Sequence, residues 1–286
     1  QGLEINPDGI YVDVTFGGGG HSRAILKKLS KGGRLLAFDQ DEAAQQNIIS
    51  DERFQLINGN FSHLKRHLKF YGISIVDGIL ADFGVSSHQF DSGSRGFSTR
   101  LEGPLDMRMN AQNELSAYEV VNEYSSEELQ RIFKSYGELR IAKKLADLIV
   151  AQRNQAPLET TQALVNLLAP SLPKHVFNKI IAQVFQAIRI EVNAELDVIK
   201  SFLEQSVGLL TKGGRMLCIS YHSLEDRLVK NFIKKGKFVG DLEKDFYGNP
   251  IKPFKEITRK PMLPSQEEIT ANPRARSAKL RIAEKA

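Results

Sequence analysis

Four consecutive glycines stand between an apolar strand and a helix in the segment YVDVTFGGGGHSRAIL, residues 11–26. Glycine adopts positive φ without steric cost and lets a ligand approach bare main chain, but it weakens any helix or strand that contains it. A turn from a strand into a helix needs one or two glycines rather than four. We therefore expect a ligand to lie against the loop of residues 17–20, called the glycine loop below.

The first third of the chain alternates between apolar strands and helices. Strands that alternate with helices pair in parallel through right-handed crossovers, and strands without a polar side belong in a sheet covered on both faces. The fold class is therefore α/β, with a mostly parallel, doubly wound sheet. The expected strands are residues 10–16, 34–39, 54–60, 76–84, 215–221 and 278–283, and the expected helices are residues 22–29, 41–49, 62–70, 194–210 and 224–235.

The middle of the chain breaks this alternation. Residues 83–110 show neither the strand period nor the helix period, and a loop of that length is usually functional or disordered. Its aromatic residues argue against disorder. The segment that follows has helical periodicity, a capping box of Ser125 and Glu128, and no strand. We therefore divide the chain into a discontinuous core of residues 1–109 and 188–286 and a helical insert of residues 110–187.

The chain of 286 residues carries a net charge of +5, but the charge is unevenly distributed. Residues 227–286 contain 15 Lys and Arg against 7 Asp and Glu, a net of +8. A basic end suits a polyanion such as nucleic acid, and a solvated basic surface explains it equally well. The single cysteine, Cys218, excludes a disulfide framework and favours a cytoplasmic location. No apolar run approaches the ~20 residues of a membrane span, so we expect no membrane contact.

Three classes of ligand compete for the glycine loop. A Walker phosphate loop ends in Gly-Lys-Ser/Thr, whereas this loop ends in Gly20, His21 and Ser22, which excludes that class. A dinucleotide loop reads G-x-G-x-x-G, and Ser22 occupies its third glycine position, which disfavours NAD without excluding it. S-adenosylmethionine lacks a pyrophosphate and needs close approach to the main chain more than an anion site. S-adenosylmethionine and NAD therefore both stay open for this loop.

Three further candidate ligand contacts lie at or just after the ends of the expected strands. Asp39 ends the second strand, where a carboxylate accepts hydrogen bonds from ribose hydroxyls; the alternative is an N-cap of the next helix. Asp82 ends the fourth strand, beside the expected ligand; the alternative is a turn residue before a glycine. Phe61 follows the third strand, where it would stack on an adenine or pack in the core.

Several long motifs are similar to those of the bacterial ribosomal RNA small-subunit methyltransferase H family. They are TFGGGGHS, FDQD, GNFSHL, DFGVSSHQFD, RGFS, GPLDMRMN, VFQAIRIEVNAEL, SYHSLEDRLVK and NPRARSAKLR, and they span nearly the whole chain. The resemblance implies a Rossmann-like class I methyltransferase core with an inserted helical subdomain that contributes to substrate recognition. It also implies an enzyme that methylates N4 of a cytidine in the decoding centre of 16S ribosomal RNA, with the small ribosomal subunit as its partner.

The resemblance also implies a set of cofactor contacts. They fall on Gly19, Gly20, His21, Asp39, Phe61, Asp82 and Gln89. Gln89 lies in the long loop, where no local pattern distinguishes it. No His, Cys or Asp cluster has the spacing of metal ligands, so we expect no metal.

The catalytic and RNA-binding residues are harder to assign. Many amino-methyltransferases carry an Asp/Asn-Pro-Pro-Tyr run after the fourth strand, and DFGV replaces it here. Candidate substitutes are Ser86, Ser87, Asn193 and His222, although a structural role is the better explanation of each one taken alone. Arg95, Arg100 and Arg189 are candidate phosphate contacts, and Tyr221 could stack on the target base. The alternatives are a DNA amino-methyltransferase, a non-catalytic RNA-binding protein and, more remotely, an NAD oxidoreductase. The helical insert could also form a homodimer surface.

Overall fold

The computed structural model describes residues 2–286, which fold into two compact units. The first unit holds residues 2–84 and 196–286, and the second holds residues 85–195. The second unit is therefore larger than the predicted insert of residues 110–187. The physical reason is that Phe97, Leu105 and Met107 of the long loop are buried in the core of the helical unit. The boundaries predicted at 109 and 188 need correction to 84 and 196.

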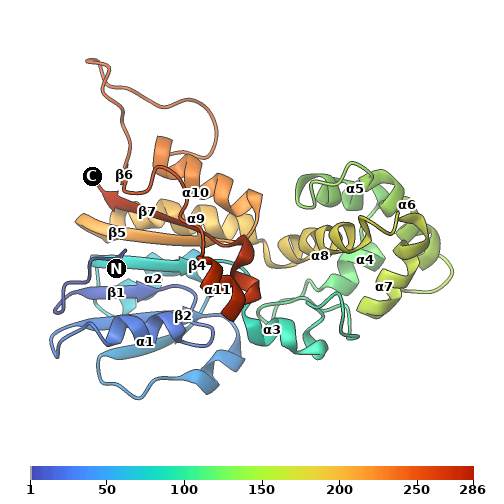
Figure 1. Ribbon diagram of the computed structural model, residues 1–286, viewed down its shortest axis with the longest axis horizontal. Coiled ribbons are helices and arrows are strands. Elements are labelled where there is room, and N and C mark those ends of the chain that lie inside the picture. The colour runs from blue at the N-terminus through green and yellow to red at the C-terminus, as the bar shows by residue number, and fades with distance from the viewer. Residues whose placement is uncertain (1) are drawn as a thin grey trace. The chain divides into compact units, whose positions relative to one another are not determined.

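The first unit is built on a seven-stranded sheet with the order β3-β2-β1-β4-β5-β7-β6 (Figure 1). Its strands are β1 (Ile10–Asp13), β2 (Arg34–Asp39), β3 (Phe54–Asn58), β4 (Val76–Asp82), β5 (Leu210–Ser220), β6 (Phe254–Glu256) and β7 (Lys279–Lys285). Strands β1 to β5 pair in parallel, and β7 pairs antiparallel with both β5 and β6. The predicted α/β class with a mostly parallel sheet is confirmed.

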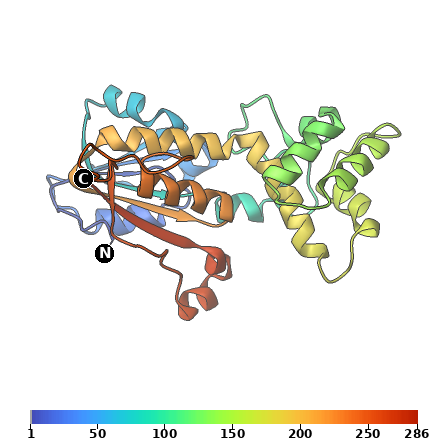
Figure 2. The ribbon, with the colours of Figure 1, turned by 90° about the horizontal axis from the view of Figure 1, so that it is seen from above.

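Helices cover both faces of this sheet, as the apolar strands require (Figure 2). One face packs against α2, α9 and α10, through side chains such as Leu68, Phe202 and Phe232. The other face packs against α1, through Ile25 and Leu26. The helices of this unit are α1 (Gly20–Leu26), α2 (Leu64–Phe70), α9 (Glu195–Leu209), α10 (Ser223–Lys235) and α11 (Gln266–Ala271), with 3-10 turns η1 (Glu42–Asn47), η2 (Phe61–His63) and η5 (Pro273–Ser277).

The second unit is helical and contains no strand among its described residues. Its elements are α3 (Ser87–Asp91), α4 (Ala117–Glu123), α5 (Ser126–Ser135), α6 (Ala142–Arg153), α7 (Thr161–Leu168) and α8 (Phe177–Asn193), with 3-10 turns η3 (Gly93–Arg95) and η4 (Ala169–Ser171). The predicted face of α5 is buried, with Leu129, Ile132 and Phe133 in the core. The predicted capping box of Ser125 and Glu128 is also confirmed.

Some elements differ from the prediction. The helix expected over residues 41–49 is the short 3-10 turn η1, capped by Asp41. The sequence pattern also missed β6 and α11, because three residues and six residues are too short to show a period.

Across residues 2–286, no helix is long and apolar enough to cross a membrane.

The N-cap of α5 permits a stability test. The Ser125 hydroxyl accepts a hydrogen bond from the Glu128 amide at 3.2 Å. We expect Ser125→Ala to destabilise α5 by about 1 kcal/mol, because the first turn loses an acceptor for its free amides. Amide hydrogen exchange in α5 should then be about fivefold faster. Ser135→Ala, at the exposed far end of the same helix, is the control and should not accelerate exchange.

Candidate cofactor site

The candidate site lies where β1, β2 and β4 end. Asp13 ends β1 and pairs with Ala37 of β2 and Leu80 of β4. Asp39 and Asp82 each lie two residues beyond those partners, so both extend past the end of β1. The two acidic side chains therefore flank the glycine loop that follows β1.

The four glycines serve two different purposes. Gly19 has φ +73°, and a Cβ there would lie 2.9 Å from the Phe16 ring, so this position requires glycine for its backbone and its packing. Gly17 also has positive φ, at +50°. A Cβ on Gly18 or Gly20 would meet nothing within 4 Å. These last two glycines therefore expose bare main chain to open space, as a ligand-binding loop requires.

Asp39 holds the glycine loop in place. Its Oδ2 accepts a hydrogen bond from the Gly17 amide at 2.8 Å, and its Oδ1 accepts one from the Asp41 amide at 2.9 Å. Burial raises the pKa of Asp39 to about 6. The helix cap is Asp41, whose Oδ1 accepts from the Ala43 amide, so the N-cap alternative for Asp39 is wrong. Each Asp39 oxygen can accept a second hydrogen bond, which leaves capacity for a ligand.

Asp13 is a site residue that the sequence analysis missed. It is fully buried, and burial raises its pKa. The Ser22 hydroxyl donates to its Oδ2 at 2.7 Å, and the Thr15 amide donates to its Oδ1 at 3.1 Å. Ser22 thus replaces the third glycine of a dinucleotide loop with a buried hydroxyl that ties α1 to β1. The sequence signal that could have identified Asp13 was an acidic residue within the apolar run YVDVTF.

Asp82 connects β4 to the same network. Its amide donates to the Thr15 hydroxyl at 2.7 Å, and its Oδ2 lies 3.4 Å from Nε2 of His21. This contact raises the pKa of His21. Burial, together with the nearby Asp82 carboxylate, raises the pKa of Tyr221. Oδ1 of Asp82 is buried and has no hydrogen-bond partner within residues 2–286, so a buried acceptor is left for a ligand.

Phe61 lies at the start of η2 and is half-buried. Its ring meets Phe202 edge-on at 5.7 Å between centroids and Phe83 at 6.2 Å. The side chain therefore joins the aromatic core while part of it stays exposed. Both sequence readings, core packing and adenine stacking, are compatible with this position.

Two predicted site residues of the long loop, Ser86 and Gln89, belong to the second unit. Ser86 and Gln89 form a capping box at the start of α3: the Gln89 amide donates to the Ser86 hydroxyl, and the Ser86 amide donates to Oε1 of Gln89 at 3.0 Å. Gln89 is buried. A structural role in α3 therefore explains both residues, and a cofactor contact of Gln89 stays a prediction.

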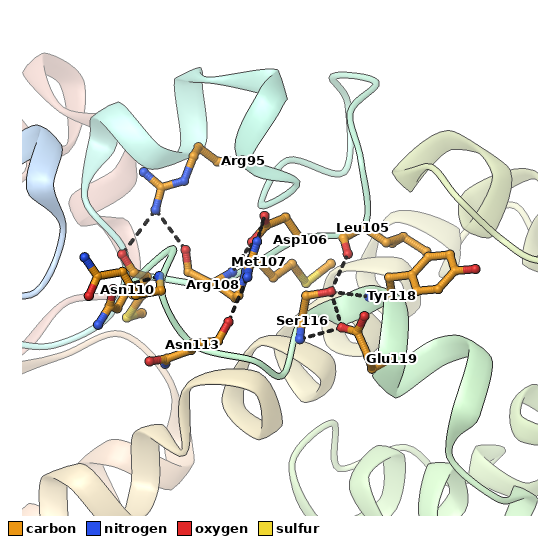
Figure 3. Close-up of polar contacts among 12 residues, drawn as sticks. Arg95, Leu105, Asp106, Met107, Arg108, Asn110, Asn113, Ser116, Tyr118 and Glu119 are labelled. Carbon is orange, nitrogen blue, oxygen red and sulfur yellow. Dashed lines mark hydrogen bonds and ion pairs between the residues drawn. The ribbon is translucent and has the colours of Figure 1, made fainter.

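The Arg95 guanidinium is used within its own unit (Figure 3). Its Nη2 donates to the main-chain oxygens of Arg108 and Met109, at 2.8 and 3.2 Å. Arg108 in turn makes a two-point ion pair with Asp106, at 3.0 and 2.8 Å. These contacts fix the segment that precedes α4, and they give Arg95 a structural role in addition to any phosphate contact.

Asn193 and Arg189, both near the end of α8, also make contacts within their own unit. The Asn193 side chain bonds three main-chain groups: it accepts from Met109 and donates to the oxygens of Met107 and Arg189. Arg189 makes a two-point ion pair with Glu195 at 2.7 and 3.0 Å. Arg100 differs from both, because it is exposed and its guanidinium contacts no acidic group in the described chain.

His222 precedes α10 in the first unit. Its Nε2 lies 3.2 Å from Oε1 of the fully buried Glu225, and the amides of Tyr221 and His222 donate to Oε2 of that carboxylate. Glu225 therefore fixes the turn that follows β5. This turn carries Tyr221 beside Asp82, so the predicted stacking residue lies next to the predicted cofactor site.

Comparison with known proteins supports the sequence resemblance. The model of the MraW methylase family matches residues 1–286. Ribosomal RNA small subunit methyltransferase H from Flavobacterium johnsoniae is 61% identical and that from Christiangramia forsetii 59%, each over the whole of this chain and 94% of the relative. The structure of an rRNA methylase from Streptococcus thermophilus aligns with a TM-score of 0.41 at 13% identity, over 98% of this chain and 89% of that chain. That structural similarity is too weak to bear on the site.

These matches settle the class of the protein. They confirm the methyltransferase expected from the motifs and, with it, S-adenosylmethionine, the standard methyl donor of methyltransferases. An NAD oxidoreductase is thereby excluded. With a family match over the whole chain and relatives above 50% identity, the chain belongs to the MraW methylase family.

Proposed function

We propose that this protein transfers a methyl group from S-adenosylmethionine to N4 of a cytidine in the decoding centre of 16S ribosomal RNA. The names of the relatives support a small-subunit ribosomal RNA substrate. The motif resemblance suggests the cytidine and its place in the RNA. The observation that carries the proposal is the pair of acidic strand ends, Asp39 and Asp82, on either side of a glycine loop with bare main chain.

The residues present fit the proposed cofactor. Asp39 keeps acceptor capacity for ribose hydroxyls, and Asp82 has a buried oxygen without a partner in the described chain. The main chain at Gly18 and Gly20 leaves room for close approach. Phe61 would contact the adenine with the exposed part of its ring. We assign Gly19 to the same site because it lies in the glycine loop. We assign His21 to it because the imidazole lies beside the Asp82 carboxylate.

When bound, S-adenosylmethionine supplies an electrophilic methyl group on its sulfonium. A cytosine amine is a weak nucleophile because its lone pair is delocalised into the ring. We infer that the protein acts mainly by holding the amine in line and by accepting its hydrogens. Among the candidate acceptors, Ser86 and Asn193 already bond main-chain groups. The ring nitrogens of His222 are buried and have only Glu225 in ion-pair contact within residues 2–286, and Ser87 is exposed, so these two residues stay the candidates.

The target base must also be unstacked to reach the methyl group. Tyr221, beside Asp82, is placed to stack on such a base, and Arg100 is available for a phosphate. The second unit would contribute to recognition of the RNA. A cytoplasmic location follows from this substrate and stays a prediction, as does a homodimer.

A transfer assay tests the substrate directly. Purified protein and S-adenosylmethionine carrying a labelled methyl group are incubated with unmethylated small ribosomal subunits, naked 16S ribosomal RNA or duplex DNA. We expect label in the RNA samples only, with N4-methylcytidine as the labelled nucleoside after digestion. Labelled DNA would instead favour a DNA amino-methyltransferase. RNA binding without any transfer would favour a non-catalytic protein.

The raised pKa of Asp39 predicts a pH dependence of cofactor binding. Ribose hydroxyls donate best to an ionised carboxylate, and the free protein protonates Asp39 as the pH falls through about 6. We therefore expect the dissociation constant of S-adenosylmethionine to rise below pH 6, by up to about tenfold per pH unit, in calorimetry from pH 5 to 8.

Two Asp-to-Asn variants test the source of this pH dependence. Asp39→Asn removes the titrating group and one of the two acceptors that face main-chain amides. It should bind the cofactor more weakly and lose the pH dependence assigned to Asp39. Asp41→Asn is the matched control, because Asn still caps η1. It should keep the pH dependence but shift it to lower pH, because the Asp41 charge contributes to the raised pKa of Asp39. An unchanged profile in Asp39→Asn would contradict the assignment.

A further inference from the structure

Two side chains outside the acidic strand ends hold the main-chain oxygens of the glycine loop. The Asn47 side-chain amide donates to the Gly17 oxygen at 3.1 Å, and Nη1 of Arg23 donates to the Gly18 oxygen at 2.6 Å. Nη2 of the same arginine donates to the Asn47 oxygen at 3.2 Å. These three hydrogen bonds link Gly17, Asn47, Arg23 and Gly18 in one closed circuit, called the loop clamp below.

Arg23 has no other partner that would explain its conformation. It lies on the exposed side of α1 and makes no ion pair with any residue in 2–286. Its guanidinium instead lies against the loop, where a Cβ on Gly19 would be 2.8 Å from Nη1. Holding an exposed arginine in one conformation costs side-chain entropy. Its contacts with the main chain of the loop and of η1 therefore point to a role in ordering the loop.

The loop clamp fixes the direction of one main-chain amide. A peptide unit is planar and trans, so its oxygen and its N–H point in opposite directions. Asn47 holds the Gly17 oxygen, so the Gly18 N–H of the same peptide points away from that side chain. Gly18 is exposed, and its amide makes no hydrogen bond within residues 2–286. The Gly18 amide is therefore an unused donor that is held in one direction.

The neighbouring amides of the loop are used by the fold itself. The Gly17 amide donates to Asp39, and the Gly19 amide donates to the Phe16 oxygen at 2.7 Å. Of the first three amides of the loop, only that of Gly18 is left for a ligand within the described chain. A Cβ on Gly18 would meet nothing within 4 Å, so a ligand has room to approach it.

We infer that Asn47 and Arg23 are positioning residues of the cofactor site, which orient the Gly18 amide toward an acceptor atom of S-adenosylmethionine. Asn47 acts directly on the peptide between Gly17 and Gly18. Arg23 acts by holding both the Asn47 oxygen and the Gly18 oxygen. A donor that is oriented before binding lowers the entropy cost of binding. The inference rests on the place of the cofactor in the proposed function and deepens it.

The first test measures cofactor affinity by calorimetry. We expect Asn47→Ala and Arg23→Met each to raise the dissociation constant of S-adenosylmethionine at least about fivefold, because the cofactor must then order the loop itself. Arg23→Lys keeps one charged donor and should be intermediate. Gln46→Ala removes an exposed amide from the same 3-10 turn, and Lys28→Met removes an exposed cation just after α1. Both are matched controls and should bind as the wild type does.

The double variant N47A/R23M tests whether the two residues act as one unit. Both hold the same loop, so the two effects should not multiply. We expect the double variant to bind the cofactor about as weakly as the weaker-binding single variant. A dissociation constant raised by the full product, about 25-fold for two fivefold effects, would show that the residues act separately and would overturn the loop clamp.

The Gly18 amide itself gives a readout that a general loss of stability would not produce. In protein labelled with nitrogen-15, a new hydrogen bond to the cofactor should move the Gly18 amide proton resonance downfield at saturating S-adenosylmethionine. We expect this shift in the wild type and in Gln46→Ala, and a smaller shift in Asn47→Ala even at saturation.

The outcomes separate this inference from the proposed function. A Gly18 resonance that stays unchanged while the wild type binds the cofactor would overturn the inference, and the methyl transfer would still stand. Wild-type affinity in both Asn47→Ala and Arg23→Met would overturn it in the same way. Absence of methyl transfer by the wild type would overturn the proposed function instead.

Discussion

The hydrogen bond from the Gly17 amide to Asp39 is the contact on which the cofactor site depends. It joins the loop after β1 to the end of β2 and so fixes where the bare main chain of Gly18 and Gly20 lies. A buried carboxylate is unfavourable unless donors surround it, and here two main-chain amides supply them. The pKa of Asp39 nevertheless remains raised, because the effect of burial outweighs that of the two amide donors.

Hydrogen-bond donors also surround the acidic side chains at the ends of the neighbouring strands. Asp13, Asp39 and Asp82 stand at the ends of β1, β2 and β4, where Asp13 lies close enough to the other two for the charges to affect one another. Ser22, Thr15 and His21 supply donors or positive charge to this group. One buried oxygen of Asp82 still lacks a donor within residues 2–286. A ligand rich in hydroxyl and amino groups would complete the network, and a ribonucleoside is such a ligand.

Several candidate residues also hold structure within their own unit. Arg95 and Arg189, the candidate phosphate contacts, bond main-chain oxygens and Glu195, and Asn193, a candidate acceptor for the amine, bonds main-chain groups. Their roles toward the RNA stay predictions.

The sequence by itself determined strands β1 to β5 and β7, the glycine loop, the acidic strand ends and the family, because these depend on local pattern and on motifs contiguous in the chain. Tertiary structure decided the rest. It moved the unit boundary to residue 84, because Phe97 and Leu105 find their apolar partners in distant helices. It also showed that Asp13 and Ser22 form one buried pair. Burial and hydrogen-bond partners arise from residues far apart in the chain, so no local pattern records them.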